Sequence, residues 1–288
     1  MEKTKKSKRN LLLLILVVVA AIGIRVYDYI NGGVRLTEGE AELHFIYVGQ
    51  GDSTLIMCEE GNILIDAGPF EARNDVVTYL EGVGVKEIEY CIFTHPHEDH
   101  IGGAKAVIEN FDVKNVIMTD RTADTKTYLN LLGALEKSDA RVLKARIGDT
   151  YSVGDFEFEI LAPFDTGSKV DTNNTSIVIR AVFGTSSMLF MGDAESGVEA
   201  ELIEAYGDGL RSDLIKVGHH GSKTSSSQKF LDEVNPEYAV ISCGVDNIFA
   251  HPHRETIDRL NKMDVKIFRT DKSGTVVLLL DGKSIYLK

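Results

Sequence analysis

The segment His95-Pro96-His97-Glu98-Asp99-His100 constrains this chain more than any other feature. Its imidazoles and its Asp carboxylate can converge on one point only if the segment forms a tight loop, because a regular helix or strand would direct them to different sides. Pro96 favours such a loop, since it restricts His95 to extended geometry. Histidine and aspartate are ligands of Zn, Mn and Fe ions in proteins. The segment therefore predicts a metal site.

The composition is that of an ordinary globular protein. Charged residues make up 26% and hydrophobic residues 43% of the 288 residues, which excludes a disordered chain and a polytopic membrane protein. The formal charge of −13 argues against general binding of polyanions by the chain as a whole. Three cysteines supply neither a disulfide framework nor a CxxC zinc motif. The chemistry is expected from histidine, since seven of the eight histidines fall in three clusters: His95/His97/His100, His219/His220 and His251/His253.

Residues 1–32 predict a membrane anchor or a signal peptide. Residues 2–9 carry five basic side chains, and residues 11–24 form an uncharged apolar run. We favour a signal anchor, because no clean A-x-A cleavage site follows the run. Both alternatives place the rest of the chain outside the cytoplasm, either held at the cell membrane or secreted. Residues 33–40 are expected to be a linker, and residues 41–288 a folded domain.

Apolar β-type runs alternate with helix-period stretches along the domain. The runs expected as strands are Leu43–Val48, Ser53–Cys58, Asn62–Asp66, Ile88–Thr94, Val113–Met118, Phe156–Ala162, Ser176–Val182, Met188–Met191, Leu214–Val217, Tyr238–Ser242, Val265–Arg269 and Thr275–Leu280. The expected helices span 71–82, 102–110, 124–137, 195–206, 226–234 and 254–263. Hairpin-like pairs of strands also occur, 53–58 with 62–66 and 275–280 with a further strand at 284–287. This mixture predicts an α/β (α+β) fold in which helices cover sheets, rather than one all-parallel sheet.

Four of the expected strands deliver an acid or an imidazole at their C-terminal ends. These residues are Asp66, His95, Asp193 and His219. Ligand sites of α/β proteins form at such strand ends. We therefore expect side chains from distant parts of the sequence to meet the histidine segment at one edge of the fold.

Together these motifs are similar to those of a known superfamily. The HxHxDH segment followed by Gly102-Gly103, with an earlier strand ending in Asp-Ala-Gly, resembles the metallo-β-lactamase superfamily. A wider set resembles the extracellular hydrolase domain of the ComEC family of DNA-uptake channel proteins: Val48-Gly49-Gln50-Gly51-Asp52-Ser53, Asn173-Asn174-Thr175-Ser176, Gly192-Asp193, His219-His220-Gly221-Ser222, and Ser242-Cys243-Gly244 with His251-Pro252. The resemblance spans about residues 41–287, without the channel's membrane helices. It implies a four-layer αββα sandwich.

The resemblance also implies two divalent metal ions, Zn or Mn, between the two sheets. Carried over to this sequence, His95 and His97 would hold the first ion. Asp99 and His100 would hold the second, and Asp193 would bridge both.

One of the adjacent histidines His219 and His220 would complete the second ion's ligands. We favour His219, which follows the strand directly, and expect His220 to face the substrate. Asp66 would orient a ligand imidazole from behind.

The chain departs from the superfamily pattern at the first ion. No histidine occurs between residues 101 and 192, where the third histidine of that site is expected, and Asn173-Asn174 stands near its place. An amide oxygen is a harder and weaker ligand than imidazole, which favours Mn over Zn or a partly filled site. Relative to the ComEC pattern, Tyr47 replaces an Asp and Ala250 replaces a Gly.

The implied activity is that of a metal-dependent hydrolase. Two ions would lower the pKa of a bridging water from ~15.7 toward ~7 and so supply hydroxide. Asp99, Asp193 and His220 are the candidates for catalysis and proton transfer. Ser222, His251 and His253 are candidates for substrate contact, although the last two are also typical of a solvated helix start.

The least acidic part of the chain carries two of the histidine motifs. Residues 211–288 hold 12 Lys and Arg against 10 Asp and Glu, and Lys216, Lys223, Lys229 and Arg254 lie near the motifs. An anionic substrate is therefore expected there. The resemblance to the ComEC family implies an extracellular phosphodiesterase or nuclease acting on DNA. The alternative is a phosphodiesterase or phosphocholine-type esterase acting on cell-wall polymers, and a β-lactamase or lactonase is less favoured.

Overall fold

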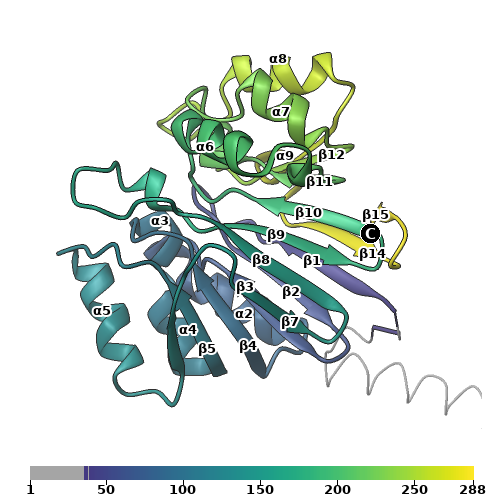
Figure 1. The fold of residues 1–288 in the computed structure, drawn as a ribbon. Coiled ribbons are helices and arrows are strands. Elements are labelled where there is room, and N and C mark those ends of the chain that lie inside the picture. The colour runs from purple at the N-terminus through teal and green to yellow at the C-terminus, as the bar shows by residue number, and fades with distance from the viewer. Residues whose placement is uncertain (1–35, 38) are drawn as a thin grey trace, which may run out of the picture.

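The computed structural model describes residues 36–37 and 39–288. Two β-sheets face each other, and helices cover their outer faces (Figure 1). The prediction of a mixed α/β fold with helix-covered sheets is thereby confirmed. The expected anchor or signal segment in residues 1–32 lies outside the described residues, as does part of the expected linker. Within the described part of the chain, no helix has the length and apolar character needed to span a membrane.

The first sheet contains eight strands in the order β15-β14-β1-β2-β3-β4-β5-β6. Their bounds are β1 Ala41–Phe45, β2 Thr54–Cys58, β3 Gly61–Ile65, β4 Glu87–Phe93, β5 Asp112–Met118, β6 Arg141–Lys144, β14 Val276–Leu280 and β15 Ile285–Leu287. Strands β3 to β6 are parallel, while β1, β2, β14 and β15 pair antiparallel with their neighbours. The C-terminal ends of β3 and β4 therefore lie at the same edge of the sheet.

The second sheet contains seven strands in the order β13-β12-β11-β10-β9-β8-β7. Their bounds are β7 Thr150–Val153, β8 Phe156–Ala162, β9 Val178–Phe183, β10 Ser186–Phe190, β11 Leu214–Lys216, β12 Tyr238–Ile241 and β13 Lys266–Arg269. Strands β10 to β13 are parallel, so their C-terminal ends also share one edge. These two edges carry the polar residues that the sequence singles out.

Helices form the outer layers of the sandwich. The α-helices are α2 Arg73–Gly82, α3 Glu98–Ile101, α4 Ala104–Asn110, α5 Lys126–Leu135, α6 Ser196–Tyr206, α7 Gln228–Val234, α8 Arg254–Lys262 and α9 Thr270–Ser273. Short 3-10 turns are η1 Phe70–Ala72, η2 Asn173–Thr175, η3 Gly207–Leu210 and η4 Gly218–Gly221. Two helices begin at side-chain caps, with Thr125 accepting from Tyr128 N at α5 and Ser227 accepting from Phe230 N at α7.

Three apolar layers hold the sandwich together. Strand residues alternate in direction, so Ile63 and Ile65 enter the core between the sheets while Leu64 packs under the helices on the opposite face. Phe45 of the first sheet stacks on Phe190 of the second, with ring centroids 6.5 Å apart. Helices α2, α4 and α5 cover the first sheet, and α6, α7 and α8 cover the second.

Each strand expected from an apolar run is present, with ends shifted by a few residues. Two further strands, β6 and β7, were not expected. Both lie at sheet edges, and most of their residues are exposed or half-buried, so they lack an apolar run. Edge strands of this kind leave little signal in a hydrophobic pattern.

Candidate metal centre

The polar residues that follow four strands meet at one edge between the two sheets. Asp66 follows β3 and His95 follows β4 in the first sheet, whereas Asp193 follows β10 and the His219-His220 pair follows β11 in the second. Contacts between these residues confirm the prediction that the strand ends converge.

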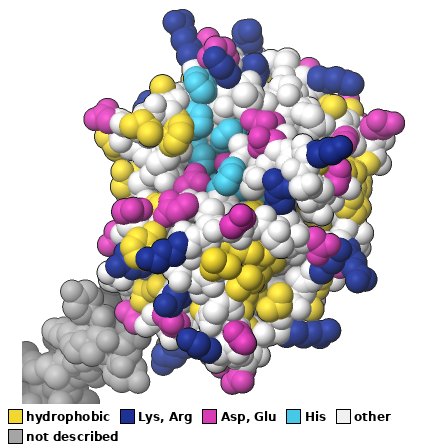
Figure 2. Space-filling view, turned by 90° about the vertical axis from the view of Figure 1, so that its left-hand side faces the viewer, with side chains coloured by type: hydrophobic (Ala, Val, Ile, Leu, Met, Phe, Trp, Pro, Cys, Tyr) yellow, Lys and Arg dark blue, Asp and Glu magenta, His cyan; other side chains and the backbone are white. Residues whose placement is uncertain are grey.

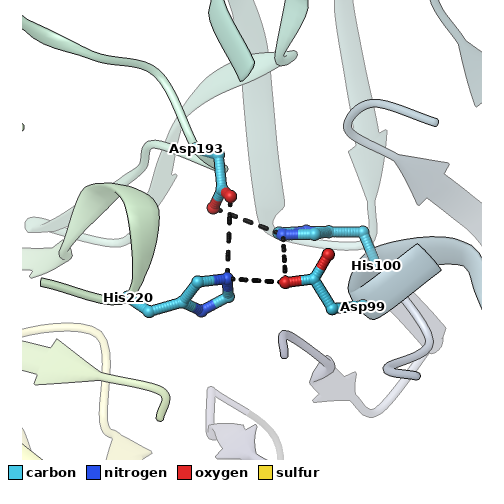
Figure 3. A group of neighbouring side chains, drawn as sticks. All are labelled: Asp99, His100, Asp193 and His220. Carbon is cyan, nitrogen blue, oxygen red and sulfur yellow. Dashed lines mark hydrogen bonds and ion pairs between the residues drawn. The ribbon is translucent and has the colours of Figure 1, made fainter. Parts of the chain in front are cut away.

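A compact group of four side chains lies at the centre of this edge. The potential ligand atoms of Asp99, His100, Asp193 and His220 all lie within 4.8 Å of one another, and the side chains point toward one another (Figure 3). His100 Nε2 lies 3.3 Å from Asp193 Oδ1. His220 Nε2 lies 3.1 Å from Asp99 Oδ2 and 3.6 Å from Asp193 Oδ2. The group thus joins the helical end of the histidine segment to the second sheet.

The histidine segment is only partly the tight loop that its sequence predicts. His95 to His97 form a loop, but α3 begins at Glu98 and contains Asp99 and His100. His97 is extended, with φ −76° and ψ 151°, and it forms the N-terminal boundary of the helix. The convergence therefore results from an abrupt change from loop to helix, and not from a loop alone.

A second, more open set of side chains lies on the other side of Asp193. His95 Nε2 lies 3.9 Å from Asp193 Oδ2 and 3.0 Å from His97 Nδ1. His219 Nε2 also lies 3.9 Å from Asp193 Oδ2, and it is 3.4 Å from Asn173 Nδ2. Asn173 is thus close to the place where the third histidine of the family pattern was expected.

The two adjacent histidines reach opposite parts of the centre because of an unusual backbone. His219 and His220 have φ values of 49° and 52°, which is the left-handed region that non-glycine residues rarely adopt. Such conformations cost about 1–3 kcal/mol each and occur mostly at functional sites. The sequence favoured His219 as the partner of Asp99 and His100, but the structure puts His220 in the compact group and His219 beside Asn173.

Polar partners behind the imidazoles fix the direction of each ring. His100 Nδ1 lies 2.7 Å from Asp66 Oδ2, and Asp66 also accepts from the backbone N and the hydroxyl of Thr94. His220 Nδ1 donates to the carbonyl oxygen of Ser242 at 3.1 Å. These contacts leave Nε2 of both rings facing Asp193, as metal-binding histidines require. The expected position of Asp66 behind a ligand imidazole agrees with this geometry.

Partners of the same kind hold the rings on the open side. His95 Nδ1 lies 3.2 Å from Ser176 Oγ, which also accepts from Asp193 N. His219 Nδ1 lies 3.3 Å from Glu195 Oε1. Asn174 supports Glu195 in turn, because its Oδ1 accepts from Glu195 N at 3.0 Å. Asn174 therefore acts through Glu195 and does not face Asp193 directly.

Charges within the compact group reinforce one another. Burial by itself would raise the pKa of Asp193, but His220 and His100 hold it well below its ordinary value. Burial would likewise raise the pKa of Asp99, yet His100 and His220 lower it. For His100, burial opposes protonation, but Asp193, Asp66 and Asp99 raise its pKa well above the usual value. A cation is therefore favoured at this position, whether it is a proton or a metal ion.

Orphaned polar atoms test whether a metal ion fits. His100 Nε2, Asp193 Oδ1 and Asn173 Oδ1 are buried and have no hydrogen-bond partner, although the first two lie only 3.3 Å apart. Buried polar atoms of this kind are nearly always paired in proteins. A divalent ion would satisfy these atoms, and imidazole with carboxylate is a donor set that Zn and Mn accept. The residues present therefore fit such an ion.

A buried ion pair that the sequence did not predict lies beneath the centre. Lys216 Nζ lies 2.8 Å from both carboxylate oxygens of Asp52, and both side chains are almost fully buried. Asp52 Oδ1 lies 3.8 Å from His220 Nδ1. Lys216 was expected to attract an anionic substrate, but burial and pairing with Asp52 keep it from the surface. Lys216 lies inside an apolar strand, and this position in the sequence could have indicated that its side chain is buried.

Asp52 also belongs to a second acidic group, with Asp66 and His100. The carboxylates of this group already have partners, since Asp52 pairs with Lys216 and Asp66 with His100 and Thr94. We therefore assign this group to the support of the ligand imidazoles, and not to a further ion.

The expected substrate residues lie beside the centre at different depths. Ser222 is buried, and its hydroxyl lies 2.9 Å from Thr224 Oγ1, so it supports the turn. His251 and His253 are half-buried, and their rings lie 4.9 Å apart. His251 also lies 5.4 Å from the His219 ring. The structure thus brings His251 and His253 to the rim of the centre.

The fold and the centre define a metal-dependent hydrolase, and the chain belongs to the metallo-β-lactamase superfamily, whose family model matches residues 46–245. The chain is 29% identical over 255 residues to ComE operon protein 3 of Bacillus subtilis (strain 168), which covers 82% of this chain and 33% of that protein. It is 32% identical over 242 residues to competence protein ComA of Neisseria gonorrhoeae, with coverage of 83% and 32%. The chain thus spans about a third of the length of these relatives. The resemblance inferred from the motifs is confirmed.

A solved structure supports the assignment of the fold. Igni18, described as a metallo hydrolase from the hyperthermophilic archaeon Ignicoccus hospitalis, superposes with a TM-score of 0.54 at 14% identity. The match covers 82% of this chain and 98% of Igni18. At this level of identity, the similarity concerns the fold alone.

Proposed function

We propose that this chain is a metal-dependent phosphodiesterase that cleaves DNA outside the cell. The observation that carries the proposal is the position of Asp193, a buried carboxylate between two sets of imidazoles. The ring nitrogens of these imidazoles that face away from Asp193 already contact other protein groups. Competence proteins among the relatives favour DNA over other phosphodiesters.

The same geometry suggests how two ions would be held. Asp99, His100, Asp193 and His220 would hold one ion. His95 and His97 would hold the other together with Asp193, with His219 and Asn173 beside them. Bound there, two divalent ions supply the Lewis acidity that activates water and offsets the charge of a phosphodiester.

The protein's own groups would orient the reaction and move protons. His220 donates from Nδ1 to the Ser242 carbonyl, which leaves the lone pair of Nε2 directed at the centre. Asp99 is the most exposed member of the compact group, with 30% of its side chain accessible, so it can exchange protons with solvent. In hydrolysis, a water oxygen bonds to phosphorus, one P–O ester bond breaks, and the leaving oxygen takes up a proton.

We also propose that residues 1–32 anchor the chain in the cell membrane with the hydrolase domain outside. The motivation is the basic stretch at residues 2–9 followed by the apolar run at 11–24. Protease added to intact cells should release the domain. Full protection of the domain would contradict this orientation.

The basic activity can be tested with a simple phosphodiester. The purified full-length chain should hydrolyse bis-p-nitrophenyl phosphate with Mn²⁺ or Zn²⁺ and stop when a chelator is added. Asp99→Ala should abolish turnover, whereas His44→Gln should retain it, because His44 lies on β1 with Tyr79 and Glu42 as partners. Absence of turnover with every divalent ion would contradict the proposal.

A comparison of different substrates then identifies the natural one. Single-stranded DNA should be cut. A cephalosporin should not be cut, because the site of the first ion lacks the third histidine of the superfamily pattern. Release of phosphocholine or glycerol phosphate from cell-wall polymers, without cleavage of DNA, would instead support a wall esterase.

A further inference from the structure

A loop with exposed apolar side chains lies beside the metal centre. Residues 244–253, here called the rim loop, contain Val245, Ile248 and Phe249, which are 58%, 92% and 55% exposed. The space-filling view of this side of the molecule shows a column of histidine side chains with hydrophobic side chains next to it (Figure 2). Exposed apolar groups that gather at a site usually mark a binding surface.

The rim loop is held in a defined conformation. Asn247 Nδ2 donates to the carbonyl oxygens of Gly244 and His251, and Asn247 Oδ1 accepts from His251 N. Ala250 has a φ of 56°, where the family pattern has a glycine that adopts this angle without strain. Phe249, next to it, is therefore presented to solvent by a loop that its own hydrogen bonds fix.

A series of nearly parallel rings connects Phe249 to the compact group. The rings of Phe249 and His251 have centroids 5.7 Å apart and an interplanar angle of 24°. The rings of His251 and His220 are 6.1 Å apart at 27°. His220 in turn contacts Asp99 and Asp193. A substrate atom at the metal centre is thus only two ring contacts away from an exposed aromatic face.

The cationic side chains at the same place differ in their access to solvent. Lys223, whose backbone N donates to His253 Nδ1, is exposed. Lys216 is buried against Asp52, and Arg254 lies at the start of α8 within 3.5 Å of Asp258. Glu195 places a further carboxylate on the open side of the centre. Affinity for a nucleic-acid strand can therefore combine phosphate contacts, for which Lys223 and Arg254 are accessible, with contacts to its bases.

We propose that Phe249 is a stacking platform for an unpaired base of a single-stranded nucleic acid whose adjacent phosphodiester lies at the metal centre. This inference rests on the proposed phosphodiesterase function and names the form of its substrate. A base presents a flat π-face that stacks on an exposed aromatic ring. In a duplex, both faces of each base are covered by neighbouring bases, so the platform selects single strands and free ends.

Binding of labelled oligonucleotides tests the platform independently of turnover. The full-length chain is titrated, with Ca²⁺ in place of Mn²⁺ to slow cleavage, against a fluorescein-labelled oligothymidylate and an abasic oligomer of the same length. Phe249→Ala should raise the Kd for oligothymidylate about tenfold, as expected for one stacked base, and should leave the Kd for the abasic oligomer unchanged. Phe249→Trp should bind at least as tightly as the original chain.

Two controls separate stacking from general effects. Phe249→Leu keeps an apolar side chain but removes the ring, so it should behave like Phe249→Ala. Tyr286→Ala removes another exposed aromatic ring, on β15, and should change neither Kd. Circular dichroism of each variant should match the original chain, and hydrolysis of bis-p-nitrophenyl phosphate by Tyr286→Ala should match it as well.

The possible outcomes distinguish this inference from the function on which it rests. Equal loss of affinity for both oligomers, or no loss for either, would overturn the platform. Loss of turnover of p-nitrophenyl phosphorylcholine in Phe249→Ala would also overturn it in favour of a choline site. Base-dependent binding by a chain that hydrolyses no phosphodiester would retain the platform and refute the phosphodiesterase.

Discussion

The two sides of Asp193 differ in burial although they carry the same kind of side chain. On one side, the side chains of His100 and His220 are 0% and 2% exposed. On the other side, the side chain of His95 is 0% exposed as well, but His219 is 22% exposed and its outer partner Glu195 is 23% exposed. Apart from Asp99, which is 30% exposed, the buried side is therefore enclosed by protein, whereas on the open side solvent reaches the imidazole of His219.

The support behind each side follows the same division. Asp66 holds His100 from a fully buried position, and the Asp52–Lys216 pair lies beneath His220. Behind His219, Thr224 and Glu195 are the partners, and both contacts are 3.3 Å long. We expect the buried side to hold its ion more tightly and to carry more of the activity.

Asp193→Ala should have the largest effect, because this carboxylate contacts both sides. We expect loss of both ions and a fall in phosphodiesterase activity of more than about 100-fold, above the range usual for outer partners of metal ligands. Metal analysis by mass spectrometry after loading with Mn²⁺ measures the first effect, and hydrolysis of bis-p-nitrophenyl phosphate measures the second. Retention of one tightly bound ion would mean that the two sides are independent.

The adjacent histidines provide a matched pair. His220→Ala should reduce activity about 100-fold and remove the ion of the buried side, while His219→Ala should reduce activity about tenfold and weaken the other ion. Isothermal titration with Mn²⁺ should resolve the two losses. If His219→Ala proves the more damaging variant, the open side holds the essential ion and the comparison is reversed.

The outer carboxylates extend the test beyond the ligands themselves. Asp66→Asn should lower metal affinity about 10–100-fold, because it loosens the buried His100 ring. Glu195→Gln should cost less than about tenfold, because its amide can still accept from His219 and solvent screens the site. Equal losses in the same titration would show that burial does not decide how much an outer partner matters.

His44 provides a reference outside the centre, with the smallest expected effect. Burial lowers the pKa of His44, although Glu42 opposes this. The unfolded chain therefore binds a proton at His44 at a higher pH than the folded chain, and the free energy of unfolding should decrease as the pH falls below about 6.5. His44→Gln should flatten this part of the profile in urea unfolding followed by circular dichroism. An unchanged slope would assign the pH dependence to other groups.

The sequence predicted the strands, the helix-covered sheets and the convergence of Asp66, His95 and Asp193, because these follow from apolar runs with polar residues at their ends. It favoured His219 over His220 as the partner of Asp99 and His100, and this prediction was wrong, since the choice depends on two left-handed backbone positions that no residue pattern indicates. The Asp52–Lys216 pair was missed for a similar reason, as its members lie 164 positions apart in the chain.

The rim loop illustrates a further limit of sequence reasoning. His251 and His253 were singled out as histidines, whereas Phe249 belongs to no motif of the sequence. Only the structure shows that Phe249 is exposed and stacked on His251.

Each sheet supplies only half of the centre, with Asp99 and His100 following the first and Asp193 and His220 following the second. An ion can therefore bind there only when both sheets are folded and packed against each other. Slipping of one layer against the other would release the cation before the hydrophobic interior opened. Loss of metal should therefore be the earliest sign that this protein is beginning to come apart.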